Sequence, residues 1–587
     1  MGAMPPFFLH LSAMLVRIAV LFVLLALSSE LKAQVQLVCD TLKYEDRTGG
    51  AFDSVDVVNS WSSSTFDGGY DLYTYRNSNV SSLVNVLTSP QYLIPLSNKE
   101  FRYTSLPHIG FAYSFGGQGS QFLRANYSQS FTERIGLNID YSRNSSNGYL
   151  RNGAMENHDV SLKFRAYGKR LAIWIEGSYG LFKTDYSGGI TTDTLINDFG
   201  LEFTPTKKSQ ASQKASIGNA RLRTELNFLD SARRFGLTTN HEFSMYDRLY
   251  TEEDTLYGIY NEVYIDSFTT YDRYNLPKLS NGGGFFLSNS SFYLNAMVEH
   301  AYWRYRNLSL QSDTNELNLR SELLFKRGGL DISNDFSFNL YGNFNGIEDQ
   351  FRLSYARDRW KLLTHFSFIS GPPEVFKRFY RGNNFQFELS NIGRTSTVQT
   401  GGDIEIRAGD QLIGGGIAYT GLSQPYVWQD TSWTNDVYGT LSFFSVSLKA
   451  AVSYKALHIN NRFRYTYNDE KLTPSFAYDF RLFSKFKIFE AKRLELLAGV
   501  HGLMLGQFSK RSFIPALDQQ VWSSSPEIMP TFFNMSVFAG MQIDEFRFYL
   551  RFENLAYLWN DKLRSDISDY PIPSTRLRIG VVWDFYN

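Results

Sequence analysis

Residues 575–587, at the end of the chain, alternate between apolar and polar positions. Leu577 begins a series of apolar side chains at odd positions that ends at Phe585, and Arg576, Arg578 and Asp584 fall between them. A period of two residues is that of a β-strand with one apolar and one polar face. The stretch by itself fits two structures equally well, a terminal strand of a membrane barrel and an edge strand of a soluble sandwich.

The same alternation recurs from His108 to the end of the chain, in segments of about ten residues, and no segment shows a sustained helical period. Clear examples are 135–141, 160–166, 222–228, 463–467, 476–482 and 546–552. About ten residues is the length that a tilted strand needs to cross a membrane. We therefore expect an all-β fold, a transmembrane antiparallel up-and-down β-barrel of about 22 strands, with a range of roughly 16–24.

Charged side chains decide which strand face meets lipid. A charged residue that faces lipid at mid-depth costs about 2–4 kcal/mol, so a face with arginines at successive alternate positions must turn to water. Six arginines are therefore predicted to line the lumen: Arg462, Arg464, Arg547, Arg551, Arg576 and Arg578. A soluble sandwich would place the apolar face inward instead. The number of alternating strands, larger than is usual in a sandwich, argues against that fold.

The spacing of the predicted strands gives an independent check on topology. Long connections at 184–214, 250–288, 422–435, 509–529 and 559–574 all follow odd-numbered predicted strands, whereas most even-numbered strands end in tight turns. Long loops outside and short turns inside is the rule for outer-membrane barrels. Two stretches do not fit: 371–382, which is long but follows an even-numbered predicted strand and precedes a strand predicted at 383–392, and 436–454, which is long enough to contain a further turn.

The N-terminus predicts export. Arg17 precedes an unbroken apolar run from Ile18 to Leu27, and small or polar residues follow up to Ala33. This pattern is that of a cleaved signal peptide over residues 1–33, and the run is too short to span a bilayer. Residues 34–100 are polar with short apolar stretches, so we expect a periplasmic or lumen-tucked arm before a barrel at 101–587.

Composition agrees with strands that alternate rather than with helical membrane spans. Aromatic residues make up 16% of the chain, but hydrophobic residues total only 43% and the mean hydropathy is −0.28. The 58 basic and 58 acidic residues cancel, so no nucleic-acid partner is implied. With one cysteine, Cys39, and no His/Cys cluster at metal-ligand spacing, we expect neither a metal nor another cofactor.

Strand geometry argues against two candidate catalytic pairs. His158 and Asp159 are neighbours in sequence, as are His241 and Glu242, and adjacent residues on a strand point to opposite faces. The glycine-rich stretch 116–119 lacks the Lys-Ser/Thr and the helix of a phosphate loop, so it is interpreted as a hairpin turn. We expect a protein that is not an enzyme.

Residues 147–151 (Asn-Gly-Tyr-Leu-Arg), Asn157, Lys169-Arg170 and 187–190 (Ser-Gly-Gly-Ile) together resemble the N-terminal barrel region of the putative porins of Bacteroidetes. In that family a Gly-x-x-Arg hairpin is followed by an Asn-Gly-Gly-Ile element, and here Ser187 replaces the Asn. The local similarity covers about 90 residues around 100–190. It implies a barrel in the outer membrane of a Gram-negative bacterium and presumed passive transport.

Two functions of different classes follow as expectations. The first is a porin-like channel for passive diffusion of small polar solutes, surrounded by outer-membrane lipid. The second is a non-conducting barrel platform in a secretion or surface-assembly complex, with a periplasmic protein partner at residues 34–100. About 22 strands enclose a lumen that usually holds a plug. Residues 34–100 are short for the globular plug of an energised transporter, and no energy-coupling motif is evident near Gln34.

Overall fold

The computed structural model describes residues 101–586, apart from 103, 105, 193–195, 197–199, 230–233, 255–259, 309, 343–345, 374, 390–392, 430, 436, 489–493, 523–526 and 560–566. The predicted signal peptide and the predicted arm at 34–100 lie outside the described residues.

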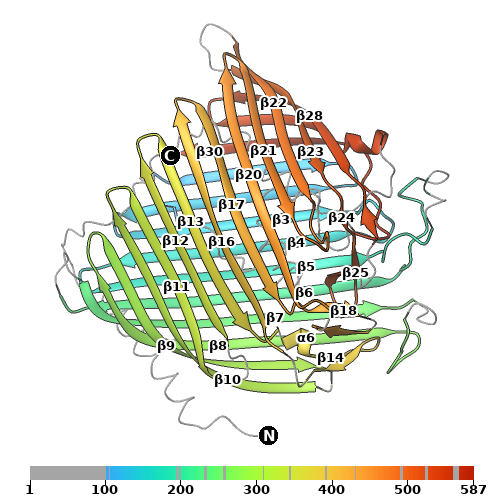
Figure 1. The fold of residues 1–587 in the computed structure, drawn as a ribbon, viewed down its shortest axis with the longest axis horizontal. Coiled ribbons are helices and arrows are strands. Elements are labelled where there is room, and N and C mark those ends of the chain that lie inside the picture. The colour runs from blue at the N-terminus through green and yellow to red at the C-terminus, as the bar shows by residue number, and fades with distance from the viewer. Residues whose placement is uncertain are drawn as a thin grey trace.

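Twenty-two strands form one sheet that closes on itself (Figure 1). They are β1 (His108–Gly116), β2 (Gln121–Thr132), β3 (Ile135–Ser146), β4 (Met155–Tyr167), β5 (Leu171–Tyr186), β6 (Ala211–Asn227), β7 (Arg234–Glu252), β8 (Thr270–Ser288), β9 (Phe292–Asn307), β10 (Leu310–Arg327), β11 (Leu330–Tyr341), β12 (Ile347–Arg357), β13 (Trp360–Gly371), β16 (Thr395–Ala408), β17 (Gln411–Ser423), β20 (Thr440–Tyr454), β21 (Leu457–Tyr467), β22 (Phe476–Ile488), β23 (Leu494–Leu505), β28 (Phe532–Ile543), β29 (Phe546–Glu553) and β30 (Arg576–Tyr586).

Each barrel strand is antiparallel to the next one along the chain, and the first pairs with the last. β1 and β30 run antiparallel from His108 opposite Tyr586 to Gly116 opposite Arg578. This seam removes both free sheet edges, which would otherwise expose unpaired backbone groups. The predicted all-β up-and-down barrel is confirmed, and so is the strand number. Among the described residues, no helix has the length and apolar character to cross a membrane.

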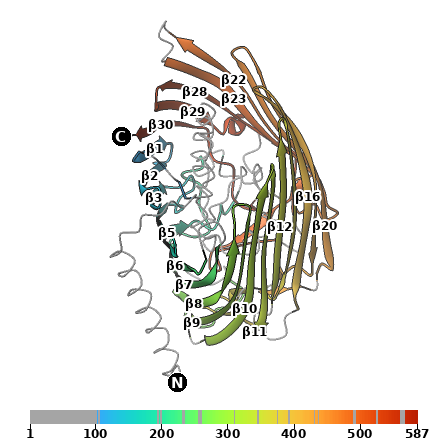
Figure 2. The same cartoon turned by 90° about the vertical axis from the view of Figure 1, so that its left-hand side faces the viewer.

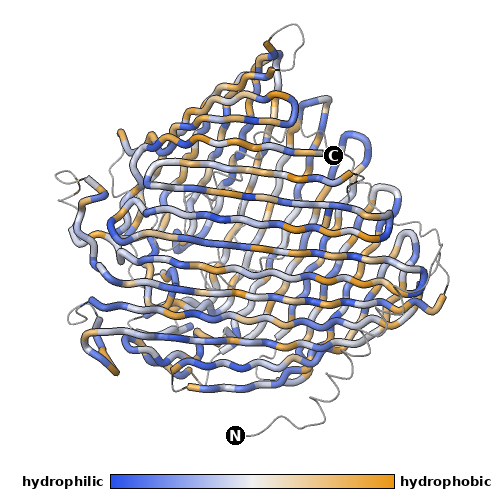
Figure 3. Tube along the Cα trace, turned by 180° about the vertical axis from the view of Figure 1, so that it is seen from behind, coloured by the Kyte–Doolittle hydropathy of each residue, from blue (hydrophilic) through white to orange (hydrophobic). Residues whose placement is uncertain are grey.

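The outer surface of the barrel is apolar. On β30, Leu577 and Trp583 are 39% and 44% exposed, whereas Arg576 and Arg578, on either side of Leu577, are buried. The same alternation of hydrophobic and hydrophilic positions runs along strand after strand in Figure 3. A soluble sandwich would bury the apolar face instead. An apolar band of this extent on the outside is what a lipid-facing barrel requires.

Two of the predicted strand positions are wrong. Residues 270–288, expected within a long connection, form β8, while residues 383–392 contain only the short strand β15 (Gln386–Glu388), which pairs with β14 (Phe379–Arg381) outside the barrel sheet. The two errors cancel in the strand number. They also explain the exception at 371–382, because the connection after β13 then follows an odd-numbered barrel strand. The other exception, 436–454, holds the single strand β20 and no additional turn.

The two ends of the barrel differ in their connections. At one end, every turn between barrel strands has six residues or fewer. At the other end, eight longer connections gather, which we call the loop layer: 147–154, 187–210, 253–269, 372–394, 424–439, 468–475, 506–531 and 554–575. Its short elements include α6 (Val375–Arg378), β18 (Val427–Gln429) and β25 (Arg511–Ile514), which lie together at that end in Figure 1. Figure 2 shows the ring of strands around these connecting segments.

The loop layer has its own hydrophobic core. Tyr246, Tyr274 and Tyr305 on β7, β8 and β9 pack against Tyr380 and Trp428 from two different loops. Each buried aromatic side chain contributes a large apolar area to this contact. The loops are therefore fixed to the inner wall of β5–β9 and to one another.

Three residues of the family resemblance contribute to a second core in the loop layer. Tyr149, Leu150 and Ile190 are buried together with Ile567 and Tyr570 from the last connection. Gly148, Gly188 and Gly189 have φ of +79°, +66° and +84°, a backbone conformation that glycine adopts without steric cost. These motif residues thus connect the first long loops of the chain to the last one.

Candidate functional site

Four of the six predicted arginines lie on the last two strands of the barrel. Arg547 and Arg551 on β29, and Arg576 and Arg578 on β30, all point inward and are at least nine-tenths buried. The structure therefore places them on the predicted face of each strand. That they line a conducting path stays a prediction, because burial limits their contact with lumenal water.

Glu553 is the centre of this arginine cluster. Its carboxylate accepts hydrogen bonds of 3.0 Å from Nε of Arg576 and 3.0 Å from Nε of Arg578, and Nε of Arg551 lies 4.0 Å away. Arg551 also reaches His501 Nδ1 at 2.9 Å. Opposite charges this close to a buried carboxylate offset the cost of its desolvation. The cluster joins the last two strands at the point where the barrel closes.

The remaining three predicted arginines lie outside the cluster around Glu553. Arg547 is 3.9 Å from Asp584, which in turn is 3.0 Å from His108 on β1. Arg462 and Arg464 belong to β21, where Arg462 is exposed and stands opposite Asp479 in the register with β22. Three strands, β22, β23 and β28, separate β21 from β29. The six arginines therefore form a cluster of three, a separate Arg547, and a pair, rather than one patch.

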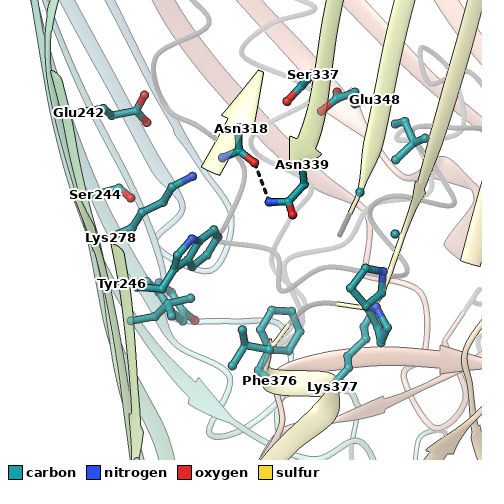
Figure 4. A pocket seen from close by; sticks show the side chains of 18 of the residues that line it. Glu242, Ser244, Tyr246, Lys278, Asn318, Ser337, Asn339, Glu348, Phe376 and Lys377 are labelled. Atoms are coloured by element: carbon teal, nitrogen blue, oxygen red, sulfur yellow. Dashed lines mark hydrogen bonds between the residues drawn. The ribbon is translucent and has the colours of Figure 1, made fainter. Parts of the chain in front are cut away.

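A cavity of about 680 Å³ lies between the loop layer and the inner wall. β7 and β8 contribute Glu242, Ser244 and Lys278 to one side of it, and β10 and β11 contribute Asn318 and Asn339 to the other (Figure 4). Phe376 and Lys377, from α6, close it on the side of the loops. Its volume falls within the range of about 300–1,000 Å³ that is usual for small-molecule sites.

Arg248 on β7 fastens the loop layer to the wall. Its guanidinium is fully buried and donates hydrogen bonds to the carbonyl oxygens of Pro515 (2.9 Å) and Ala516 (2.8 Å) and to Gln213 Oε1 (2.5 Å). Tyr380 from another loop donates to the same Ala516 carbonyl at 3.2 Å. Because an arginine has five donors in a planar fork, one side chain can hold two consecutive carbonyls and a third acceptor together.

Asp518 completes this contact from the loop side. Tyr186 and Gln213 donate to its carboxylate at 3.0 and 3.2 Å. Asp518 has φ of +54°, which aspartate tolerates better than most residues, at the turn that follows β25. Burial raises the pKa of Asp518 to about 6, against the opposing effect of the nearby positive charge of Arg248. The contact between loop and wall therefore contains a group that titrates near neutral pH.

A second polar contact holds the 372–394 loop. Asn383 accepts hydrogen bonds from the backbone N–H groups of Ile265 and Asp266, both at 2.9 Å, and its own N–H donates to Asp272 at 2.8 Å. It thus joins one loop to the connection 253–269 and to the start of β8. Satisfying several backbone groups with one side chain fixes the path of both connections.

The sequence pattern did not identify Arg248, Lys278, Asn318 or Asn339. Each is a polar residue on a strand face that is already expected to be polar, so the alternation does not distinguish it from its neighbours. For Lys278 the pattern gives no signal at all, because it lies in β8, a segment that the sequence predicts to be a loop. Among the described residues, no group of three His, Cys, Asp or Glu side chains could hold a metal ion.

Comparisons with solved structures find the same fold in large barrels. The siderophore receptor PirA from Acinetobacter baumannii matches with a TM-score of 0.56 and 10% identity, over 83% of this chain and 81% of that one. The FrpB iron transporter from Neisseria meningitidis (F5-1 variant) matches with 0.56 and 10%, over 82% and 83%. For PirA from Pseudomonas aeruginosa the values are 0.51 and 11%, over 82% and 81%. At this identity the similarity shows the fold alone.

A search of curated proteins finds no match. A family model described as "Putative porin" matches residues 72–587, most of the chain and all of the barrel. This agrees with the closed sheet, its apolar outer surface and the motif residues of the first loops. The chain belongs to the putative porin family and is an outer-membrane β-barrel.

Proposed function

We propose that this protein is an outer-membrane channel for passive diffusion of small polar solutes, in which the loop layer narrows the passage. The observation that carries the proposal is the cavity of about 680 Å³, with charged, amide and hydroxyl side chains, between the loop layer and the inner wall, which strands from β5 to β17 contribute to. A barrel of this size needs interior structure to leave a selective rather than a wide-open pore. The loop layer supplies such structure.

The inner wall supports movement of polar solutes. Ser178, Asn219, Ser244, Ser337 and Thr397 line the cavity from five different strands. Hydroxyl and amide groups replace water's hydrogen bonds to a solute without binding it tightly. Many weak partners along the wall suit passage, because a solute must be able to leave as well as enter.

Planar-bilayer recording of the purified full-length protein tests this function. We expect discrete, reproducible conductance steps. The variant Arg248→Met tests the role of the loop layer. It should give larger or noisier conductance steps than the wild type, because it releases the 506–531 loop from the wall. A folded wild-type barrel that stays silent, while Arg248→Met conducts, would show that the native loop layer closes the passage and would overturn passive diffusion.

The same experiments can support either of two other functions. The extensive packing of the loops favours a ligand-specific uptake barrel, the class that the names "siderophore receptor" and "iron transporter" describe for proteins of the same fold. A barrel that is silent in every variant but co-purifies with a periplasmic protein would indicate the platform function instead. In that case, removing residues 34–100 should abolish the co-purification.

A further inference from the structure

We infer that the cavity beneath the loop layer is a binding subsite for a neutral polyhydroxylated solute, of the carbohydrate class. The inference rests on the proposed transport function and names the kind of solute that it would select. It is built on the balance of charge around the cavity, on an unsatisfied buried acceptor in its wall, and on the donor and apolar surfaces that lie beside it.

Charges around the cavity cancel. Three carboxylates and three cationic side chains belong to its wall: Glu176, Glu242, Glu348, Arg221, Lys278 and Lys377. A site for an anion or a cation would carry an excess of the opposite charge, since that excess both attracts the ion and offsets its desolvation. A cavity without net charge instead favours a solute without net charge.

Asn339 offers an acceptor to a ligand. Its side chain is 8% exposed, its Nδ2 donates to Asn318 Oδ1 at 2.7 Å, and its Oδ1 has no hydrogen-bond partner among the described residues. Figure 4 shows this amide pair at the cavity, opposite Lys278. An unsatisfied buried acceptor is destabilising, so a ligand hydroxyl that donates to Asn339 would recover the lost hydrogen bond.

Lys278 offers donors across the cavity from Asn339. Its ammonium lies 4.5 Å from the centroid of the Trp303 ring, and among the described residues it forms no ion pair. The cation–π contact holds the side chain in place but uses none of its three N–H groups in a hydrogen bond to a fixed acceptor. A solute that meets both Lys278 and Asn339 must therefore accept on one side and donate on the other.

Hydroxyl groups meet that requirement, because each both donates and accepts. Ser244 and Ser337 add further hydroxyls on the two sides, and Tyr246 and Phe376 add apolar surface between them. Small-molecule sites combine a few placed polar groups with such apolar surface. A sugar ring, with hydroxyls around its edge and C–H bonds on its faces, presents the matching pattern.

Isothermal titration of the detergent-solubilised full-length barrel tests the inference with sucrose as the neutral probe, gluconate as the anion and glucosamine as the cation. We expect sucrose to bind more tightly than either charged probe. Asn339→Leu and Lys278→Met should each weaken sucrose binding about tenfold, the loss of one good hydrogen bond. Asn460→Leu on β21, outside the cavity wall, is the matched control and should leave binding unchanged.

A substitution that changes only the charge of residue 339 tests the inference without altering the packing of the side chain. Asn339→Asp keeps the size of the side chain and should shift preference from sucrose toward glucosamine. Tighter binding of gluconate or glucosamine by the wild-type protein, or equal sucrose binding by wild type and Asn339→Leu, would overturn the inference.

Bilayer recording of the same preparations separates the two proposals. A conducting barrel without sucrose binding contradicts only the subsite, whereas sucrose binding by a silent barrel contradicts only passive diffusion. Heat-modifiable migration on gels confirms that each variant is a folded barrel before it is compared.

Discussion

Arg248 Nη1 donates a 2.8 Å hydrogen bond to the carbonyl oxygen of Ala516, 268 positions further along the chain. Both groups are fully buried, one on a barrel strand and the other at the tip of a loop. Removing a charged side chain from water costs free energy, and a protein tolerates this only where several acceptors form hydrogen bonds with the side chain. The bond is thus one of the buried polar contacts that hold the 506–531 loop to the barrel wall.

Replacing Arg248 by Met should free this loop while leaving the barrel intact. The change removes the donor to the Pro515 carbonyl and to Gln213, while the Ala516 carbonyl keeps its bond from Tyr380. Each buried group left unsatisfied costs about 1–3 kcal/mol. We expect faster proteolysis within 506–531 and larger conductance steps. Arg273→Met on β8 is the matched control, because Arg273 pairs with Asp247 at an exposed position and such pairs contribute little. Equal proteolysis of the two variants would contradict this role of Arg248.

The docking of the loop should depend on pH through Asp518. Its pKa is about 6 in the folded protein and close to 3.9 in an unfolded chain, so burial disfavours the charged form. The docked loop is then most stable below about pH 4, and this stability is lost as the pH rises through 6. We expect proteolysis within 506–531 to be slower at pH 5 than at pH 7.5.

The neighbours of Asp518 define the control for this pH dependence. Arg248, Tyr186 and Gln213 surround it, and Asn tolerates the same positive φ. Asp518→Asn should therefore keep the loop docked and give the same proteolysis rate at both pH values. A variant that retained the wild-type pH profile would assign the effect to another group.

Closure of the barrel should be sensitive to Gly580. Gly580 on β30 pairs with Tyr549 on β29, and a Cβ at position 580 would lie 2.2 Å from the Tyr549 ring. Gly580→Val should therefore prevent closure and leave protein that is not heat-modifiable. The double variant with Tyr549→Ala should recover assembly, because it removes the ring that the new side chain meets. Normal assembly of Gly580→Val alone would show that the ring can move aside.

Topology can be tested on intact cells. Thr192 and Glu262 are exposed residues in long connections at the end of the barrel that carries the loop layer. If long loops face the outside, as in other outer-membrane barrels, epitope tags at either position should be labelled without permeabilisation. A tag in the tight turn after β16, at Gly409, should be labelled only after permeabilisation. The reverse pattern would invert the orientation.

Ion selectivity tests the arginines at the seam. Arg576 and Arg578 are bonded to Glu553, whereas Arg547 lies 3.9 Å from its carboxylate partner Asp584. If these side chains line the conducting path, Arg547→Ser should lower the permeability of anions relative to cations, measured as a shift in reversal potential across a salt gradient. Arg357→Ser, at an exposed turn, is the control. An unchanged potential in Arg547→Ser channels would exclude Arg547 from the path.

The sequence by itself determined the class of fold, because the period of two residues places apolar and polar side chains on opposite strand faces wherever the strands pair. It also predicted that the arginines of β29 and β30 point away from lipid, and the structure buries these side chains. It could not identify β8, since Pro277 and the glycines at 282–284 weaken the local preference for a strand. Pairing with β7 over its full length overrides that preference.

The loop layer was decided by the tertiary structure alone. Phe385, Phe387 and Leu389 alternate like a barrel strand, yet they pack into the core that joins the loops. A strand with this two-residue period can place its apolar face against lipid or against protein, and only the neighbouring parts of the chain determine which. Arg248 and Ala516 are likewise ordinary residues in sequence. Their contact exists because barrel closure brings a strand and a loop from distant parts of the chain to the same place.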